Sequence, residues 1–306
     1  MEKQKSNLAG CLILMLTALI WGSAFVAQSV GMAYIGPFSF NGIRSVIGAL
    51  ALLPCIALLD RLKLSARPRT GAEKKRLLIG GLCCGLVLFA ASNFQQIGLI
   101  STPPGKGGFI TALYIVLVPI CGLFVRQSDG TRRKPSLLQW IAVCIALVGM
   151  YLLCLSSESA EGLSLASGDL MLVISALFFT LHILVIDHFA PHVDCVRMSC
   201  IQFFVSGILS LLCMLLFREE LTLTALRQCA IPILYAGVLS SGAGYTLQMI
   251  GQRRVAPTLA SLILSLESVF SVLASWVLLG DALSLRELLG CALILSAIVI
   301  AQLRRD

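Results

Sequence analysis

Ten separate apolar stretches, each about twenty residues long, constrain this chain more than any other feature. An α-helix rises about 1.5 Å per residue, so about twenty residues cross the roughly 30 Å of hydrocarbon in a bilayer. The connectors between the stretches are short and polar, which leaves no room for a soluble domain. We therefore expect an all-α membrane protein with ten transmembrane helices. The predicted spans are residues 9–30, 37–59, 77–99, 107–125, 137–155, 169–188, 196–217, 229–250, 256–279 and 285–303.

The amino-acid composition excludes an ordinary soluble domain. Hydrophobic residues make up 58% of the 306 residues and charged residues 12%, whereas soluble domains carry roughly 25% charged residues. The net charge of +8 would suit nucleic acid in a soluble protein, but here most of the cations lie in short loops between apolar spans. We expect the lipid bilayer as a partner, and no nucleic acid.

Sequence motifs typical of enzymes and metal sites are missing. There is no HExxH, no GxSxG and no Walker A loop, and the three histidines all lie between positions 182 and 192. His188 and His192 have Asp187 and Asp194 nearby, but Pro191 interrupts the helical spacing that would bring them together. The twelve cysteines lie mostly within or beside apolar spans, where Cys behaves as a small hydrophobe. We expect no catalytic residue, no metal site and no cofactor.

Lys and Arg are distributed unevenly between alternate loops. One set of loops, which includes both termini, holds 17 of these residues, and the opposite set holds 4. Cytoplasmic loops of membrane proteins carry the excess of Lys and Arg. We therefore expect both termini to face the cytoplasm.

The chain repeats itself at an offset of 153 residues. The segment from Gln95 to Pro104 matches the segment from Gln248 to Pro257 in its Gln, Ile, Gly and Pro residues, and Arg44 falls on Arg197 at the same offset. We expect two five-helix repeats, residues 1–155 and residues 156–306. Because five is an odd number, the second repeat must enter the membrane from the opposite side, and such inverted repeats recur in secondary transporters.

The last predicted helix of each repeat opens with the same kind of capping box. Ser136 is followed by Gln139, and Ser284 is followed by Glu287, so each Ser can accept a hydrogen bond from a free backbone N–H at a helix start. The two boxes are 148 residues apart. A small insertion or deletion therefore separates the two repeats.

Short motifs in a fixed order resemble those of a known family. Together with the ten spans and the duplication, they resemble EamA-type transporters of the drug/metabolite transporter superfamily over nearly the whole chain. The resemblance implies a ten-helix bundle with a central cavity between its two halves, which exports or exchanges small metabolites across a bacterial inner membrane. The motifs are Trp21–Phe25, the helix openings after Pro104 and Pro257, Leu266–Phe270, and Leu278–Asp281.

Two positions depart from the family pattern. The family often has Pro directly after the acidic residue of the ninth helix, where this chain has Ser268, and the sixth helix has no Trp that matches Trp21. Because Ser268 stands where the family often has Pro, the sequence gives no basis for a proline kink in the ninth helix. Pro119 can still kink the fourth helix.

Two charged residues at membrane depth are the first candidates for function. A charge at the centre of a membrane helix costs roughly 2.5 to 3.5 kcal/mol on insertion scales, so it needs a reason. Glu267 lies near the middle of the ninth span and Arg44 lies within the second. We expect Glu267 to couple transport to protonation or to bind a cationic group of the substrate; a structural hydrogen bond is the alternative. Arg44 either lines the pathway or meets an acidic substrate; the alternative is that it reaches toward the membrane surface or pairs with a neighbouring carbonyl.

Polar residues at helical spacing form the second group of candidates. Residues three apart share one helix face, so these pairs can line a wet cavity, or they can hydrogen-bond between helices, which contributes about 0.6 kcal/mol on average in membranes. Trp21 is a candidate for the cavity wall or for packing. The pairs are Asn93 with Gln96, Thr111 with Tyr114, and Tyr245 with Gln248.

These observations favour a secondary transporter of a small metabolite or amino-acid-like compound that works by alternating access. We expect the two halves to rock about a site at the membrane midplane. An intramembrane enzyme and a non-transporting structural membrane protein are the alternatives. The expected partners are a small-molecule substrate and lipid, and the oligomeric state is either monomer or homodimer.

The topology can be checked with single-cysteine reporters in a cysteine-depleted background. With Glu158→Cys we expect labelling by a membrane-impermeant reagent from outside the cell, and with Arg69→Cys we expect protection, because the loop from Asp60 to Arg76 carries seven of the 17 cations. The reverse labelling pattern would contradict the assignment.

Overall fold

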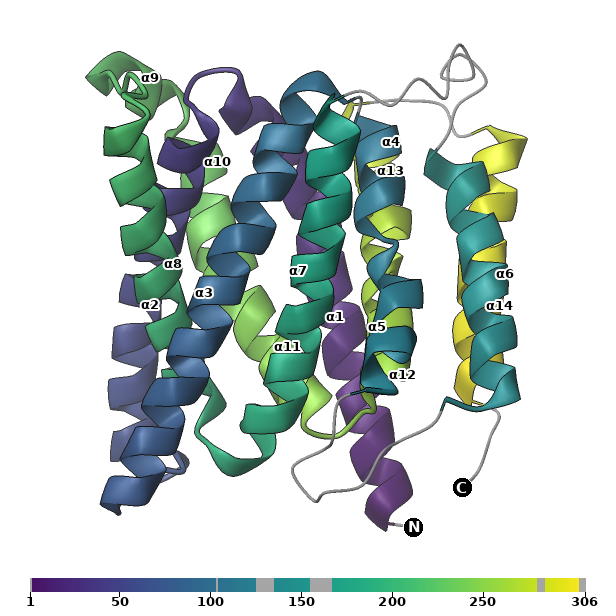
Figure 1. Cartoon of the computed structure of the whole chain (residues 1–306), viewed down its shortest axis with the longest axis horizontal. Helices are drawn as coiled ribbons and strands as arrows, with labels where there is room; N and C mark the ends of the chain where they lie inside the picture. The colour runs from purple at the N-terminus through teal and green to yellow at the C-terminus, as the bar shows by residue number, and fades with distance from the viewer. Residues whose placement is uncertain (1, 103, 125–134, 155–166, 280–283, 303–306) are drawn as a thin grey trace.

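A computed structural model of the chain describes residues 2–102, 104–124, 135–154, 167–279 and 284–302. These residues form helices and contain no strand, and most of the helices stand side by side in one bundle (Figure 1). The elements are α1 (Glu2–Met32), α2 (Pro37–Arg61), α3 (Gly71–Ser101), α4 (Pro104–Thr111), α5 (Tyr114–Gly122), α6 (Leu137–Cys154), α7 (Ser167–Phe189), η2 (Ala190–His192), α8 (Cys195–Leu216), α9 (Leu223–Gln228), α10 (Ala230–Leu234), η3 (Tyr235–Tyr245), α11 (Thr246–Gln252), α12 (Pro257–Leu264), α13 (Leu266–Leu279) and α14 (Leu285–Gln302).

Seven helices in the described part of the chain are long and apolar enough to cross a membrane, and two further apolar helices, Gly107–Gly122 and Leu137–Leu153, are shorter. Large apolar side chains are exposed on the outer surface of the bundle, as Leu12 and Leu16 are in α1 and Leu212 is in α8. A soluble protein rarely leaves such continuous apolar faces uncovered, whereas lipid tails cover them without cost. The all-α membrane fold is confirmed, and the count of ten spans stays a prediction.

Side-chain caps fix several helix starts. Both predicted capping boxes are present, since the backbone N–H of Gln139 donates to Ser136 Oγ at 3.2 Å and that of Glu287 donates to Ser284 Oγ at 3.2 Å. A third box, in which Thr70 caps the N–H of Glu73, starts α3 at Gly71 rather than at residue 77. The prediction from hydropathy began this helix too late because its first turn is polar.

Two of the predicted spans are broken near their middle. The span 107–125 divides into α4 and α5 through a tightened turn, in which Leu113 N–H donates to Ile110 O and Val116 N–H donates to Leu113 O. The span 256–279 divides into α12 and α13 at Ser265, whose hydroxyl donates to Leu262 O at 2.7 Å. These breaks fall on equivalent positions, because 112 and 265 differ by the repeat offset of 153.

Proline does not make either break. Pro119 lies inside α5, well after the turn at Leu113, so the break comes before the proline, and a kink at Pro119 itself stays a prediction. In the ninth span, a Ser hydroxyl that hydrogen-bonds to a carbonyl of the preceding turn competes with the helical N–H for that carbonyl and bends the helix. The break therefore forms although the position after Glu267 is Ser268.

Helices of the two repeats pack as antiparallel pairs. The pair α2 and α8 is joined along its whole length: Glu219, just beyond α8, accepts from the N–H of Ser39 at 2.7 Å, Gly42 lies against Leu211, and Arg197 binds Asp60 at 2.6 Å. In the same antiparallel way α14 packs on α6, α12 on α5 and α7 on α3. The helix α13 instead runs parallel to α1, since Gly10 of α1 lies against Arg254, just before α12, and Gly22 lies against Phe270. Figure 1 shows α6 and α14 running side by side at one end of the bundle.

This interleaving bears on the expectation that the two halves rock against each other, which stays a prediction. Helices that are neighbours in space mostly come from different repeats, so the sequence halves are not two separate blocks. A motion that rocks residues 1–155 as a block against residues 156–306 would have to tear apart the tightest helix pairs.

The pair α6 and α14 provides a test of this packing. A Cβ at Gly149 would lie 2.8 Å from Gly290 O and 2.9 Å from Ile294 Cγ1. Such overpacking typically costs about 1–3 kcal/mol, so we expect Gly149→Ala to lower the thermal midpoint of the purified protein. Gly108→Ala in α4 is the control, because its Cβ would meet nothing within 4 Å. Equal stability of the two variants would contradict the close approach.

Candidate functional site

A small cavity lies at the centre of the bundle, beside the two helix breaks. Its volume is about 50 Å³, enough for a few water molecules but far below the several hundred Å³ of a typical ligand pocket. Helices of both repeats form its wall. The lining residues are Trp21, Gln28, Arg44, Gln95, Thr111, Tyr114, Phe179, His182, Ile183, Ser240, Tyr245, Gln248, Leu264 and Glu267.

One hydrogen bond at the breaks joins the two repeats. The hydroxyl of Tyr114, the first residue of α5, donates to Glu267 Oε1 at 3.1 Å, and Glu267 lies in the first turn of α13. The two positions are 153 residues apart, which is the offset of the internal repeat. Residues at equivalent positions can touch each other only close to the axis that relates the repeats. The Tyr114–Glu267 contact therefore marks the pseudo-twofold axis.

Other cavity residues are also related by this offset. Gln95 corresponds to Gln248, and Thr111 corresponds to Leu264. The cavity thus surrounds the pseudo-twofold axis. The lining is chemically asymmetric all the same, because the acidic residue comes from the second repeat while the phenol comes from the first.

Arg44 brings a positive charge into the cavity without a partner for it. Its side chain is 5% exposed, its Nε has no hydrogen-bond partner in the described part of the chain, and no described carboxylate lies within ion-pair distance. Its guanidinium carbon lies 5.8 Å from the centre of the Phe40 ring. Thr111 Oγ1 and Gln248 Oε1 are buried and lack partners among the described residues as well. Buried polar atoms nearly always have a partner, so these groups indicate a cavity that holds water or a polar solute.

Aromatic side chains form one wall of the cavity. The ring centres of Trp21 and Tyr245 are 4.5 Å apart, and the edge of His182 meets Tyr245 at 5.7 Å. Trp21 Nε1 donates to the carbonyl of Ser240 at 3.2 Å. Ser240 and Tyr245 both belong to η3, an eleven-residue π-helix, and wide turns of this kind are rare and frequent at functional sites.

The small residue after Trp21 explains how α1 reaches the cavity. A Cβ at Gly22 would lie 2.7 Å from the carbonyl oxygen of Glu267 and 2.6 Å from Phe270. Gly therefore allows α1 to approach α13 at the turn that carries Glu267. The Trp–Gly pair places a ring in the cavity wall and a close backbone contact next to it.

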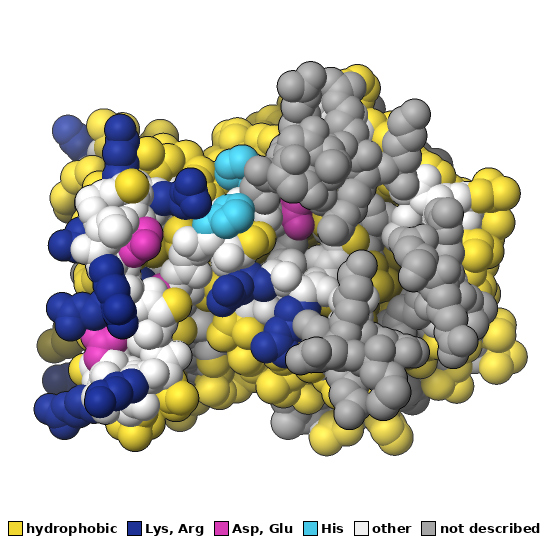
Figure 2. All heavy atoms as spheres, turned by 90° about the horizontal axis from the view of Figure 1, so that it is seen from below, with side chains coloured by type: hydrophobic (Ala, Val, Ile, Leu, Met, Phe, Trp, Pro, Cys, Tyr) yellow, Lys and Arg dark blue, Asp and Glu magenta, His cyan; other side chains and the backbone are white. Residues whose placement is uncertain are grey.

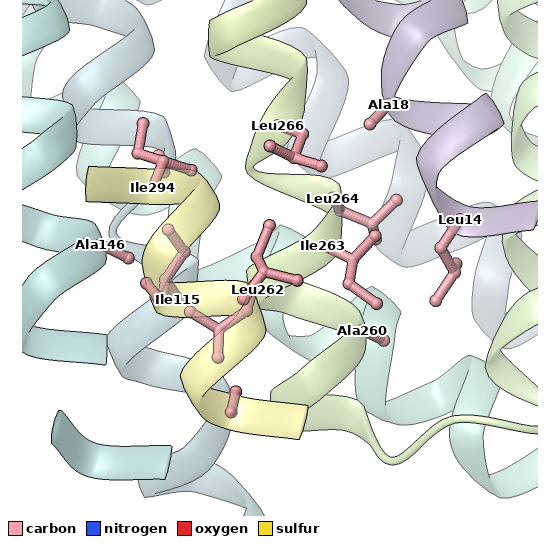
Figure 3. Close-up of a cluster of buried hydrophobic side chains, with 14 of the residues drawn as sticks. Leu14, Ala18, Ile115, Ala146, Ala260, Leu262, Ile263, Leu264, Leu266 and Ile294 are labelled. Atoms are coloured by element: carbon pink, nitrogen blue, oxygen red, sulfur yellow. The ribbon is translucent and has the colours of Figure 1, made fainter. Parts of the chain in front are cut away.

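An apolar cluster closes one side of the cavity. Leu262, Ile263 and Leu264 of α12 are buried together with Leu14 of α1 and Ile115 of α5, as Figure 3 shows. Leu262 and Ile263 precede the cavity-lining Leu264 in the chain, so they pack between the start of α12 and the cavity.

The structure places seven of the nine predicted site residues around this one cavity. They are Trp21, Arg44, Thr111, Tyr114, Tyr245, Gln248 and Glu267.

Asn93 and Gln96 do not line the cavity. The side-chain amide of Asn93 donates to Ser210 Oγ at 2.8 Å and its oxygen accepts from Asn41, so it joins α3 to α2 and α8. Gln96 is buried, with neither amide atom bonded to a described residue. The neighbouring Gln95 faces the cavity instead. The sequence therefore assigned Gln96 to the cavity-facing side of α3, whereas the residue there is its neighbour Gln95.

Several lining residues were missed from the sequence. The sequence groups His182 only with the other two histidines, yet it is buried in the wall and bonds to Gln202 at 3.0 Å. The repeat offset pointed to Gln95, because Gln248 was already a candidate. Gln28 and Ser240 carry no comparable signal in the sequence.

Comparison with known proteins decides the family. The family model of the EamA-like transporter family matches residues 8–155 and, a second time, residues 166–302. The chain belongs to the EamA-like transporter family.

Relatives of this EamA-like protein are transporters by name. An uncharacterized transporter of Archaeoglobus fulgidus is 30% identical over 95% of this chain and 85% of the relative. The uncharacterized transporter YoaV of Bacillus subtilis is 23% identical, covering 90% of each chain, and the uncharacterized inner membrane transporter YedA of Escherichia coli is 22% identical, covering 93% of this chain and 88% of the relative. A protein of known crystal structure shares the fold, with a TM-score of 0.76 at 19% identity, over 98% of this chain and 100% of that chain.

The EamA-like chain is therefore a multi-pass membrane protein, and its family and relatives indicate a transporter rather than an enzyme. The central cavity with its breaks, its acid and its guanidinium is the candidate substrate site of this transporter.

Arg44 allows a test of the cavity without knowledge of the substrate. An uncompensated buried charge lowers stability, so we expect Arg44→Met to raise the free energy of unfolding of the unliganded protein by roughly 1–3 kcal/mol. Thermal unfolding in detergent measures this change. The matched control is Arg197→Met at the equivalent position, where loss of the bonds to Asp60 and Asp194 should lower stability. A drop of similar size in both variants would show that Arg44 is already compensated.

Proposed function

We propose that this EamA-like protein is a secondary transporter that exports or exchanges a small amino-acid-like metabolite across a bacterial inner membrane. The observation that carries the proposal is the pair of opposite charges at the central cavity, Glu267 and Arg44, which do not form an ion pair with each other in the structure. A zwitterionic solute can satisfy both.

Arg44 and Glu267 each suit one charged group of a zwitterionic solute. The guanidinium of Arg44 offers a fork of N–H donors that matches a carboxylate, and Glu267 can receive an ammonium group. Thr111 Oγ1 and Gln248 Oε1 are two further hydrogen-bonding atoms that have no partner among the described residues. A solute with a single charge would leave one buried group without a partner, which costs more than the contact with the other group contributes.

The aromatic wall suits the remaining part of such a solute. Trp21, Phe179 and Tyr245 present ring surface to the cavity. Flat apolar surface favours a side chain of moderate size over a bare zwitterion. We therefore expect preference for amino-acid-like compounds that carry an apolar or aromatic group.

Alternating access is proposed to act through the two broken helices. In the present conformation the apolar cluster around Ile263 closes the side on which α12 begins. Opening that side requires α5 and α12 to move away from α1 and α7, and the turns at Leu113 and Ser265 are the points where each broken helix can bend. Discontinuous helices at a midplane site are a recurrent feature of secondary transporters.

We place both termini and the apolar cluster on the cytoplasmic side, on the strength of the 17 to 4 distribution of Lys and Arg. The cavity is then shut toward the cytoplasm in this conformation. The proposed transporter is driven by its substrate gradient or by a coupled ion, and it works as a monomer or as a homodimer.

Glu267 is proposed to be the coupling residue. Its carboxylate is held by Tyr114, and it lines the same water-sized cavity as Arg44. A proton and a cationic solute compete for such a carboxylate. Because of this competition, a single site can exchange protons for solute.

The first experiment identifies the substrate. Amino acids and related zwitterions are screened for ligand-dependent thermal stabilisation of the purified protein, because any solute that binds the folded state raises its midpoint. A hit is then tested for uptake and efflux in proteoliposomes. If zwitterions never stabilise the protein while singly charged metabolites do, the assignment of two opposite subsites is wrong.

The variant Glu267→Gln then tests coupling. It keeps the shape and the hydrogen bond from Tyr114 but cannot bind a proton or a cation. We expect normal insertion and stability, loss of pH-dependent net transport by at least about tenfold, corresponding to ~1.4 kcal/mol, and retained exchange if protonation is the coupling step. Net flux and exchange at several pH values measure this.

Tyr114→Phe is the matched control, because it removes the hydrogen bond to Glu267 but leaves the carboxylate. We expect it to shift the pH profile without abolishing net transport. Wild-type rates and pH dependence in Glu267→Gln would refute a coupling role.

A further inference from the structure

A second, larger cavity of about 510 Å³ opens at the end of the bundle where α2 ends and α8 begins. The loop between α2 and α3 forms one wall, the turn at η2 another, and Arg253 at the end of α11 a third. Its inner surface includes Leu77 and Val193, which belong to a buried apolar cluster with Met198 and Met249. This cluster separates it from the central cavity.

Arginine side chains dominate the polar lining of this cavity. Arg67 and Arg69 come from the loop, Arg76 from the first turns of α3, and Arg253 from the far wall, with His192 beside them. None of the four arginines forms an ion pair with a carboxylate in the part of the chain that the structure describes. Guanidinium groups from three separate segments therefore converge on one space.

The two carboxylates that line the cavity are already occupied. Glu73 accepts from the backbone N–H of Arg69 at 2.7 Å and from that of Thr70 at 3.3 Å, where it completes the capping box of α3. Asp194 accepts from the N–H of Arg197 at 2.9 Å and from its guanidinium at 3.1 Å. Both keep their negative charge, but two carboxylates stand against the four arginines of the lining, so positive charge is in excess there.

The loop that carries Arg67 and Arg69 is held in place by these same bonds. Ser65 donates to Asp194 at 3.1 Å and accepts from Arg197, whose guanidinium also binds Asp60. The loop is thus tied at one end to the start of α8 and at the other to the cap of α3. A held backbone leaves only the arginine side chains to be ordered when a ligand binds.

We propose that this cavity binds a phosphate-bearing anion. Arginine forks match the oxygens of a phosphate group and bind it with two parallel hydrogen bonds. The cavity lies at the end of the membrane-spanning helices, where lipid headgroups are found, and Figure 2 shows Lys and Arg side chains gathered on this face below α2, α3 and α8. Basic pockets at this level are suited to anionic headgroups and to soluble phosphate esters alike. The proposal does not depend on the identity of the transported solute.

The chain offers a matched control for the charge of this face. Lys74 and Lys75 lie beside Arg76 in the first turns of α3, but they do not line the cavity. Arg67→Gln/Arg69→Gln and Lys74→Gln/Lys75→Gln remove the same charge from neighbouring positions. A diffuse electrostatic effect changes both variants equally, while a binding site responds only to the arginine pair.

The experiment compares thermal midpoints of the purified full-length protein in neutral detergent. One arm adds phosphatidylglycerol, with phosphatidylcholine as reference, and the other adds glycerol 3-phosphate, with glycerol as reference. We expect at least one phosphate compound to raise the midpoint of the wild type and of the lysine variant by about 2–5 °C. In the arginine variant the shift should be lost. Gel filtration and the unliganded midpoint establish that each variant is folded.

The pattern of shifts identifies the source of the anion. Stabilisation by phosphatidylglycerol alone assigns the site to a lipid headgroup, and stabilisation by glycerol 3-phosphate as well assigns it to a soluble phosphate. Equal shifts in both variants, or no shift in the wild type, overturn the proposal. If Arg67→Gln/Arg69→Gln does not fold, Arg253→Gln on the opposite wall replaces it and must give the same loss.

Discussion

A helix that breaks inside a bilayer has backbone groups that hydrocarbon cannot satisfy, and this constraint governs the whole arrangement. Each unsatisfied group costs several kcal/mol in lipid, so irregular backbone is tolerated only where protein or a wet cavity surrounds it. The turn before Tyr114 and the turn at Ser265 both lie in the interior, and each uses i→i+3 bonds or a Ser hydroxyl to satisfy its carbonyls. The other helices surround this pair of breaks.

Close packing around the breaks follows from the interleaving of the repeats. Gly22, Gly149 and Gly290 stand where a methyl group would clash with a neighbouring backbone. In lipid, helices associate through such contacts rather than through hydrophobic burial. Hydrogen bonds join α2 and α8, from Ser39 to Glu219 at one end and from Arg197 to Asp60 at the other. These two helices are therefore joined at both ends.

The sequence predicted what depends on local pattern and failed where tertiary packing decides. Apolar runs predicted the spans, and Ser–x–x–Gln and Ser–x–x–Glu predicted the helix caps, because hydropathy and capping are local properties. The breaks were not predicted, since Ser265 carries no recognised helix-breaking signal and Pro119 carries one that the structure does not use for the break. Asn93 was assigned to the cavity instead of Gln95 because the pattern of a sequence does not reveal which neighbouring helix a buried polar residue faces.

The position of Tyr114 and Glu267 on the pseudo-twofold axis has an evolutionary consequence. In a dimer of two identical five-helix chains, a residue on the axis meets its own copy. Two glutamates there would repel each other, and two tyrosines would supply no acid. An acid held by a phenol at this point requires the two copies to differ, and fusion into one chain allows them to diverge. Gene duplication thus provided more than length, because it made a chemically asymmetric centre available to a nearly symmetric protein.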